Sequence, residues 1–82
     1  MTNVRVRLFA GLSGVVGSRE LAVALDGTPT VDALRLRLAD EYPVLHAFLP
    51  TLVCAVDEEV VPREHVLAEG AFVEIIPPIS GG

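Results

Sequence analysis

The sequence predicts a single α+β domain, in which a mixed sheet carries one main helix across one face. Three observations predict it. The chain has 82 residues, of which 51% are hydrophobic, which suits one small core. Two segments in the first third of the chain alternate with the period of a strand, and further strand-like segments follow in the second half. A single stretch between them has helical spacing, and runs of strands around one helix are typical of α+β domains.

The first hairpin is predicted from two alternating segments. Apolar residues alternate with Arg5 and Arg7 over residues 3–10, and the same period returns over residues 19–25. The glycine-rich segment 11–17 between them is expected to be a long loop. It lacks the lysine and the spacing of a phosphate-binding loop, and it does not match the G-x-S-x-G nucleophile motif.

The main helix is expected to begin after Thr30, a good N-cap residue. The apolar residues that recur at helical spacing are Val31, Leu34, Leu38 and, at the end, Tyr42. Pro43 restricts the residue before it, so the helix should end near Glu41. The apolar side of this helix needs a sheet to pack against.

The second half of the chain is expected to supply three further strands. The expected elements are a helical turn within 44–49, strands at 52–56 and 60–61, a turn at Gly70 and a strand at 72–76. Together with the first hairpin and the helix, this order gives a sheet of about five strands. That layout is the β-grasp, or ubiquitin-like, fold, which we assign to residues 1–76.

Composition excludes several classes of function. The net charge is −5 and all six basic residues are arginine, which argues against nucleic-acid binding. The run Asp57-Glu58-Glu59 is expected to be a solvated turn, with steering of a basic partner as the alternative. The apolar stretches are too short to span a membrane, and the N-terminus lacks a signal peptide. We therefore expect a cytoplasmic protein.

Cys54 is the single cysteine, so no internal disulfide can form. It lies in an apolar run, where a small buried hydrophobe is its expected role and chemistry the alternative. His46 and His65 give no metal-ligand spacing with it, and His46 is expected at the surface. We expect no metal site and no bound cofactor.

The C-terminal segment is the candidate reactive part. It consists of Pro77, Pro78, Ile79, Ser80, Gly81 and Gly82. The prolines end the sheet ladder and favour an extended backbone, and two terminal glycines can enter a slot that side chains would block. We expect residues 77–82 to form a flexible tail that carries the Gly82 carboxylate to another protein, the alternative being an ordinary frayed terminus.

The two ends of the chain resemble the MoaD-type sulfur carriers of the ThiS/MoaD superfamily, the small subunits of molybdopterin synthase. The most specific part of this resemblance is the proline-proline-x-x-Gly-Gly ending, and it extends to segment 6–10, to Thr30-Val31 and to the Gly70 turn. One departure is the acidic turn at residues 57–59, where the family often has an asparagine-containing turn.

The resemblance implies that the chain has no catalytic machinery of its own. A MoeB-type, E1-like adenylyltransferase would use ATP and Mg²⁺ to form an acyl-adenylate on Gly82, which sulfur would convert to a thiocarboxylate. A MoaE-type large subunit, in a heterotetramer, would receive the tail. The thiocarboxylate would then donate sulfur to cyclic pyranopterin monophosphate, two carriers supplying the two dithiolene sulfurs.

A docking surface is expected on the sheet. Phe9 and Ile76 fall on the parity opposite to the core, with Val60 nearby in the expected sheet, and exposed apolar residues gathered on one face commonly mark an interface. The alternative is that a loop covers them. Other functions stay open: a carrier for thiamin, cysteine or tRNA thiolation, a ubiquitin-like modifier of lysines, or a β-grasp binding module.

Overall fold

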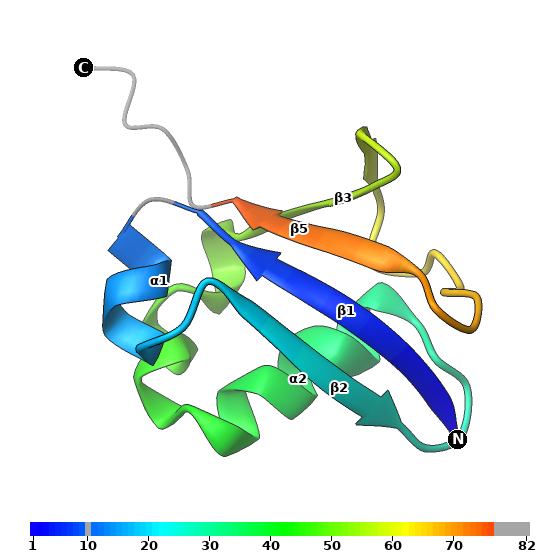
Figure 1. The fold of residues 1–82 in the computed structure, drawn as a ribbon, viewed down its shortest axis with the longest axis horizontal. Coiled ribbons are helices and arrows are strands. Elements are labelled where there is room, and N and C mark those ends of the chain that lie inside the picture. The colour runs from blue at the N-terminus through cyan, green and yellow to red at the C-terminus, as the bar shows by residue number, and fades with distance from the viewer. Residues whose placement is uncertain (10, 77–82) are drawn as a thin grey trace.

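The computed structural model describes residues 1–9 and 11–76, and within them five strands form one mixed sheet of order β2-β1-β5-β3-β4 (Figure 1). The elements are β1 Thr2–Leu8, α1 Gly11–Val16, β2 Glu20–Leu25, α2 Val31–Glu41, the 3₁₀ helices η1 Pro43–Ala47 and η2 Leu49–Thr51, β3 Val53–Val56, β4 Glu59–Val61 and β5 Phe72–Ile76. The central strands β1 and β5 are parallel, and the remaining pairs are antiparallel. The predicted α+β architecture is confirmed.

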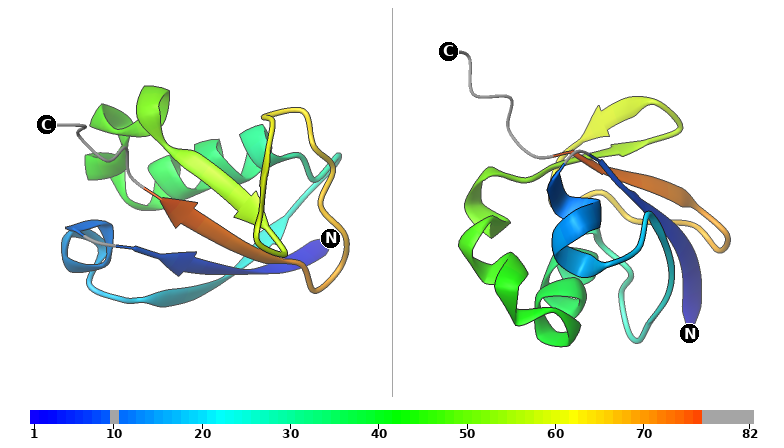
Figure 2. Two further views of the ribbon diagram at one scale, coloured as in Figure 1. Left: turned by 90° about the horizontal axis from the view of Figure 1, so that it is seen from above. Right: turned by 60° about the vertical axis from the view of Figure 1, so that its left-hand side comes forward.

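The core lies between the sheet and α2, which crosses one face of it (Figure 2). The buried side chains on the central strands are Val4, Val6, Leu8, Val73 and Ile75. Leu34 and Leu38 of α2 are buried against them, as their helical spacing predicts. Complete burial of one such side chain contributes about 1.5–3 kcal/mol, before conformational entropy is subtracted.

The boundaries of α2 follow from its flanking residues. The Thr30 side chain accepts a hydrogen bond from the Ala33 backbone N–H at 3.1 Å, which satisfies one of the free donors of the first turn. At the other end the Tyr42 N–H donates to the Leu38 carbonyl at 2.8 Å. Pro43 follows as the first residue of η1, so both predicted ends of the helix are confirmed.

The loop expected over residues 11–17 is wrong, because residues 11–16 form the short helix α1. Glycine lowers helix propensity, and two of these six residues are glycine, so local preference favours a loop. Burial of Leu12 in the core overrides that preference. Gly17, with φ of +88°, ends the helix, and its N–H donates to the Ser13 carbonyl at 2.8 Å.

The expectations for the second half of the chain are confirmed. The helical turn is present as η1 and η2, and the three strands lie within one residue of their expected bounds. Gly70 has a φ of +78°, and its N–H donates to the Asn3 carbonyl at 2.7 Å, which fixes the start of β5 beside β1. Among the described residues, no helix is long and apolar enough to cross a membrane.

Removing the N-cap oxygen should destabilise the domain. We expect Thr30→Ala to lower the free energy of unfolding by about 1 kcal/mol, because the Ala33 N–H loses its acceptor. Thr30→Ser keeps the oxygen and serves as the matched control. Urea denaturation of the three proteins measures the effect, and equal midpoints for Thr30→Ala and the wild type would contradict it.

Candidate functional site

The candidate site is the face of the sheet opposite α2, which no described helix covers (Figure 2). Strand alternation sends Val73 and Ile75 of β5 into the core. Phe72, Glu74 and Ile76 therefore point to this outer face. On the neighbouring strands, the residues that pair with these three point to the same outer face.

An apolar stripe crosses the outer face near the end of β5. Its members are Phe9, Ile76, Val53 and Val60, together with Ala55, which is on the same face but is buried. The Phe9 N–H donates to the Ile75 carbonyl at 3.2 Å, which places Phe9 beside the end of β5. Ile76 pairs with Val53, and Ala55 pairs with Val60. Val60 is 71% exposed and Val53 37%, whereas Phe9 and Ile76 are half-buried.

The structure thus brings the predicted docking residues Phe9, Val60 and Ile76 onto one face. Their contact with a partner stays a prediction. Val53 was missed by the sequence analysis, since its face depends on the register of β3 against β5, which alternation within β3 alone does not give.

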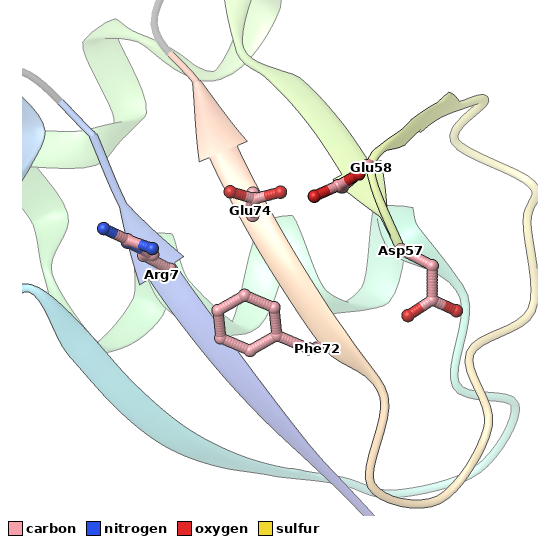
Figure 3. A pocket seen from close by; sticks show the side chains of 5 residues that line it. All are labelled: Arg7, Asp57, Glu58, Phe72 and Glu74. Carbon is pink, nitrogen blue, oxygen red and sulfur yellow. The ribbon is translucent and has the colours of Figure 1, made fainter.

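Charged side chains border the stripe and line an open pocket on the same face. Figure 3 shows Arg7 on β1, Phe72 and Glu74 on β5, and Asp57 and Glu58 at the β3–β4 hairpin. The Arg7 guanidinium lies 5.1 Å from the centre of the Phe9 ring. In this pocket the Arg7 guanidinium is on β1, Glu74 is its register partner on β5, and two further carboxylates lie at the hairpin.

Two of these carboxylates, those of Asp57 and Glu58, belong to a strained turn. Asp57 and Glu58 have φ angles of 50° and 69°, the left-handed region that both central residues of a two-residue hairpin adopt. Asparagine and glycine tolerate this region best, and other side chains are uncommon there. The predicted solvated turn is confirmed at these two exposed residues, and its acidic composition is obtained at a cost in backbone strain.

Cys54 is buried, as expected of a core residue. Burial raises the pKa of its thiol above the ordinary value of 9.0, and the nearby Arg35 guanidinium opposes this shift. A thiol in this environment is largely protonated at neutral pH and is a poor nucleophile.

The predicted tail lies outside the described residues. The structure therefore does not test the roles expected of Pro77, Pro78, Ile79, Ser80, Gly81 and Gly82. What it does describe is the strand before them: β5 pairs with β1 from Phe72 to Ile75 and with β3 from Val73 to Ile76.

The sequence matches the model of the ThiS family over residues 6–82. The chain belongs to the ThiS family. A molybdopterin synthase sulfur carrier subunit of Escherichia coli is 35% identical over 81 residues, which cover 96% of this chain and 99% of the relative. One of Chlamydomonas reinhardtii is 38% identical over 82 residues, covering 96% and 98%. The sulfur-carrier resemblance is confirmed.

Solved structures agree on the fold. The small archaeal modifier protein SAMP1 of Haloferax volcanii superposes with a TM-score of 0.85 at 27% identity, covering 98% of this chain and 99% of that one. SAMP1 of Methanosarcina acetivorans gives 0.81 at 28% identity, covering 100% and 98%. These matches confirm the β-grasp fold. A complex of subunits 1 and 2 of molybdopterin-converting factor from Helicobacter pylori matches with a TM-score of 0.68 at 20% identity, covering 99% and 100%.

The Cys54 thiol should react slowly in the folded protein. Because its pKa is raised by burial, we expect alkylation by iodoacetamide at about pH 8 to be far slower than in denaturant. The contribution of the Cys54 thiol to stability is complete below the pKa that the thiol has in the unfolded chain. It is lost as pH rises through the higher pKa of the folded state. The free energy of unfolding should therefore decline above about pH 9, with a smaller decline in Cys54→Ala; native alkylation as fast as in denaturant would contradict this.

Proposed function

We propose that this chain is the sulfur carrier subunit of a molybdopterin synthase and acts in molybdenum cofactor biosynthesis. The observation that carries the proposal is the match to two such subunits at 35% and 38% identity over nearly their whole lengths. The family match also runs through residue 82, so it includes the Gly81-Gly82 pair. The fold and the open sheet face are consistent with a protein that works by being recognised.

The proposed chemistry takes place at the Gly82 carboxylate. A carboxylate is a poor electrophile, so an activating enzyme must first transfer AMP to it from ATP, with release of pyrophosphate. Attack by hydrosulfide, or by a donor that supplies sulfur at the same oxidation level, on the acyl carbon then expels AMP and leaves a thiocarboxylate. This sulfur is finally donated to cyclic pyranopterin monophosphate, and water supplies the oxygen that restores the carboxylate for another cycle. The chain itself is proposed to bind no cofactor, and its location to be the cytoplasm.

Two partners are proposed to use the same surface in turn. One is the E1-like adenylyltransferase, which would supply the ATP and Mg²⁺ site. The other is the large subunit, which would supply the catalytic side chains, and the likeness to the Helicobacter pylori complex supports this partner through the fold alone. The apolar stripe offers each of them a contact beside the strand that precedes Pro77.

A second candidate is a ubiquitin-like protein modifier. The likeness to SAMP1 at 27% and 28% identity favours it, because those proteins are described as small archaeal modifiers. In that case the activated Gly82 would acylate a lysine of a target protein. This chain contains no lysine, so it offers no side-chain amine to itself and could not form chains through its own lysines.

Mass spectrometry distinguishes these candidates. After incubation with the activating enzyme, ATP and a sulfur donor, a carrier should gain the mass difference between sulfur and oxygen at Gly82. A modifier should instead appear attached to other proteins. Deletion of Gly82 should abolish the mass gain without changing the thermal unfolding midpoint, since residues 1–76 contain the core. A sulfur gain in the deletion variant would refute the proposal.

The apolar stripe should be required for partner binding but not for folding. We expect Val60→Asp to weaken binding of the large subunit at least about tenfold, because a carboxylate would have to be desolvated at the interface. Val60 is 71% exposed, so stability should change by about 0.5–1 kcal/mol at most.

Leu36→Asp is the matched control for Val60→Asp. Leu36 is 55% exposed but lies on α2, away from the outer sheet face. Calorimetric titration should find wild-type affinity for Leu36→Asp. Equal losses in the two variants would show that the outer face is not the docking surface.

A further inference from the structure

Arg35 is the one buried charged residue among those described, with 5% of its surface exposed. It projects from α2 into the body of the protein, and its two terminal nitrogens have acceptors. One meets the Asp32 carboxylate at 3.3 Å, and the other donates to the Leu49 carbonyl. The Nε atom is buried and has no acceptor within the described part of the chain. A buried donor without a partner is costly, so it requires an explanation.

The buried charge is also only partly neutralised. Asp32 is the single carboxylate paired with Arg35 in the described residues, and its side chain is half exposed. Water screens an exposed carboxylate, so this pair compensates little of the desolvation of the guanidinium. Arg35 therefore retains both an unused donor and uncompensated positive charge.

Arg35 lines a pocket at the open end of the β3–β4 hairpin. Cys54 and Val61 form the last pair on that side of the hairpin. Pro62 follows and has no N–H with which to extend the ladder. The pocket lies beyond this point and is lined by Val31, Arg35, Leu52, Val53, Cys54, Val60, Val61, Pro62 and Arg63.

The second guanidinium in this lining belongs to Arg63. Arg63 is exposed, and its side chain forms no ion pair with the other described residues. Its backbone carbonyl accepts from the Asp32 N–H at 2.9 Å, which anchors the residue beside the start of α2. A protein with a net charge of −5 thus has a small pocket with two arginines and mainly apolar walls.

We infer that this pocket receives the carboxylate of a glutamate or aspartate side chain from the partner that docks on the apolar stripe. A guanidinium in an apolar setting binds a carboxylate more strongly than in water, and the aliphatic walls suit the stem of such a side chain. The pocket lies on the α2 side of the sheet edge and adjoins the stripe at Val53 and Val60, which line the pocket and also belong to the stripe. A partner that docks on the stripe and extends around this edge would bring a side chain to the pocket mouth.

The inference deepens the proposed function and rests on it, because the occupant is a side chain of the proposed large subunit. The bound carboxylate would orient the partner on the sheet. An apolar stripe alone permits sliding and rotation, whereas one charge inserted at a fixed point sets the register of the complex. Register matters here, because the tail that follows Ile76 must enter the partner at one place.

The test compares Arg63→Gln with Arg37→Gln. Arg37 is an exposed arginine of α2 paired with Glu41 at 2.9 Å, away from the pocket, so its replacement removes the same charge elsewhere. The probe is the purified large subunit from the same organism, titrated at low and at physiological salt. We expect Arg63→Gln to weaken binding about tenfold and to reduce its salt dependence, with Arg37→Gln close to wild type.

A second readout concerns Arg35 itself, whose replacement could unfold the chain. In ¹H–¹⁵N NMR spectra of the wild-type protein, the Arg35 Nε–H resonance should shift, and its exchange with water should slow, when the large subunit binds. The inference is overturned if this resonance is unchanged in the complex, which would leave Arg35 a purely structural link to Leu49. It is also overturned if Arg63→Gln and Arg37→Gln behave alike.

The two proposals fail in distinguishable ways. A complex that forms with wild-type affinity for Arg63→Gln overturns the pocket and leaves the sulfur-carrier function standing. Failure of the wild-type chain to bind the large subunit at all overturns both.

Discussion

The pairing of β5 between β1 and β3 is the constraint on which the rest of the molecule depends. Val73 and Ile75 are buried on one side of this strand, and hydrogen-bonded ladders run along both of its edges. A strand held on both edges and on one face has little freedom to slip, since a shift by one residue would expose its apolar set. The position and direction in which the chain reaches Ile76 are therefore fixed by the whole core.

The same constraint gives the two faces of the sheet different roles. The inner face holds the core with α2, and in a domain of 82 residues nearly all of that apolar surface is needed for folding. We propose that recognition uses the outer face, where the apolar stripe lies and where the charged side chains shown in Figure 3 line a pocket. Because these residues contribute little to the core, that face can vary with the partner at small cost in stability. The strained acidic turn at Asp57 and Glu58 is consistent with such variation.

Much of this fold could be predicted from the sequence, because strand and helix periods are local signals. The alternation in β1 and β5, the Thr30 cap and the Pro43 boundary each act through neighbouring residues, and each was confirmed. The helix α1 could not be predicted in this way. Its glycines favour a loop, and only the buried position of Leu12 in three dimensions outweighs them.

The candidate site was predictable in part for the same reason. Strand parity identified Phe9 and Ile76 as outward-facing, and the expected sheet placed Val60 near them, but the inclusion of Val53 required the register between β3 and β5. The pocket around Arg35 gave no sequence signal. An arginine within an amphipathic helix usually reads as solvent-exposed, and its burial depends on how η2 folds back to present the Leu49 carbonyl.

The proposed docking surface beside the end of β5 would have a kinetic consequence. The sequence has six residues after Ile76, and a reactive group linked to a bound domain through so few residues gains effective concentration at the partner. In the proposed complex, a partner bound to the stripe, which ends at Ile76, would hold its own active site at a fixed distance from the end of β5. Delivery of the terminal carboxylate would then be an intramolecular step, and its cost in orientation would be met by binding at the sheet. On this proposal the body of the domain supplies the register and the partner supplies the chemistry, so that one small domain could serve two enzymes in turn.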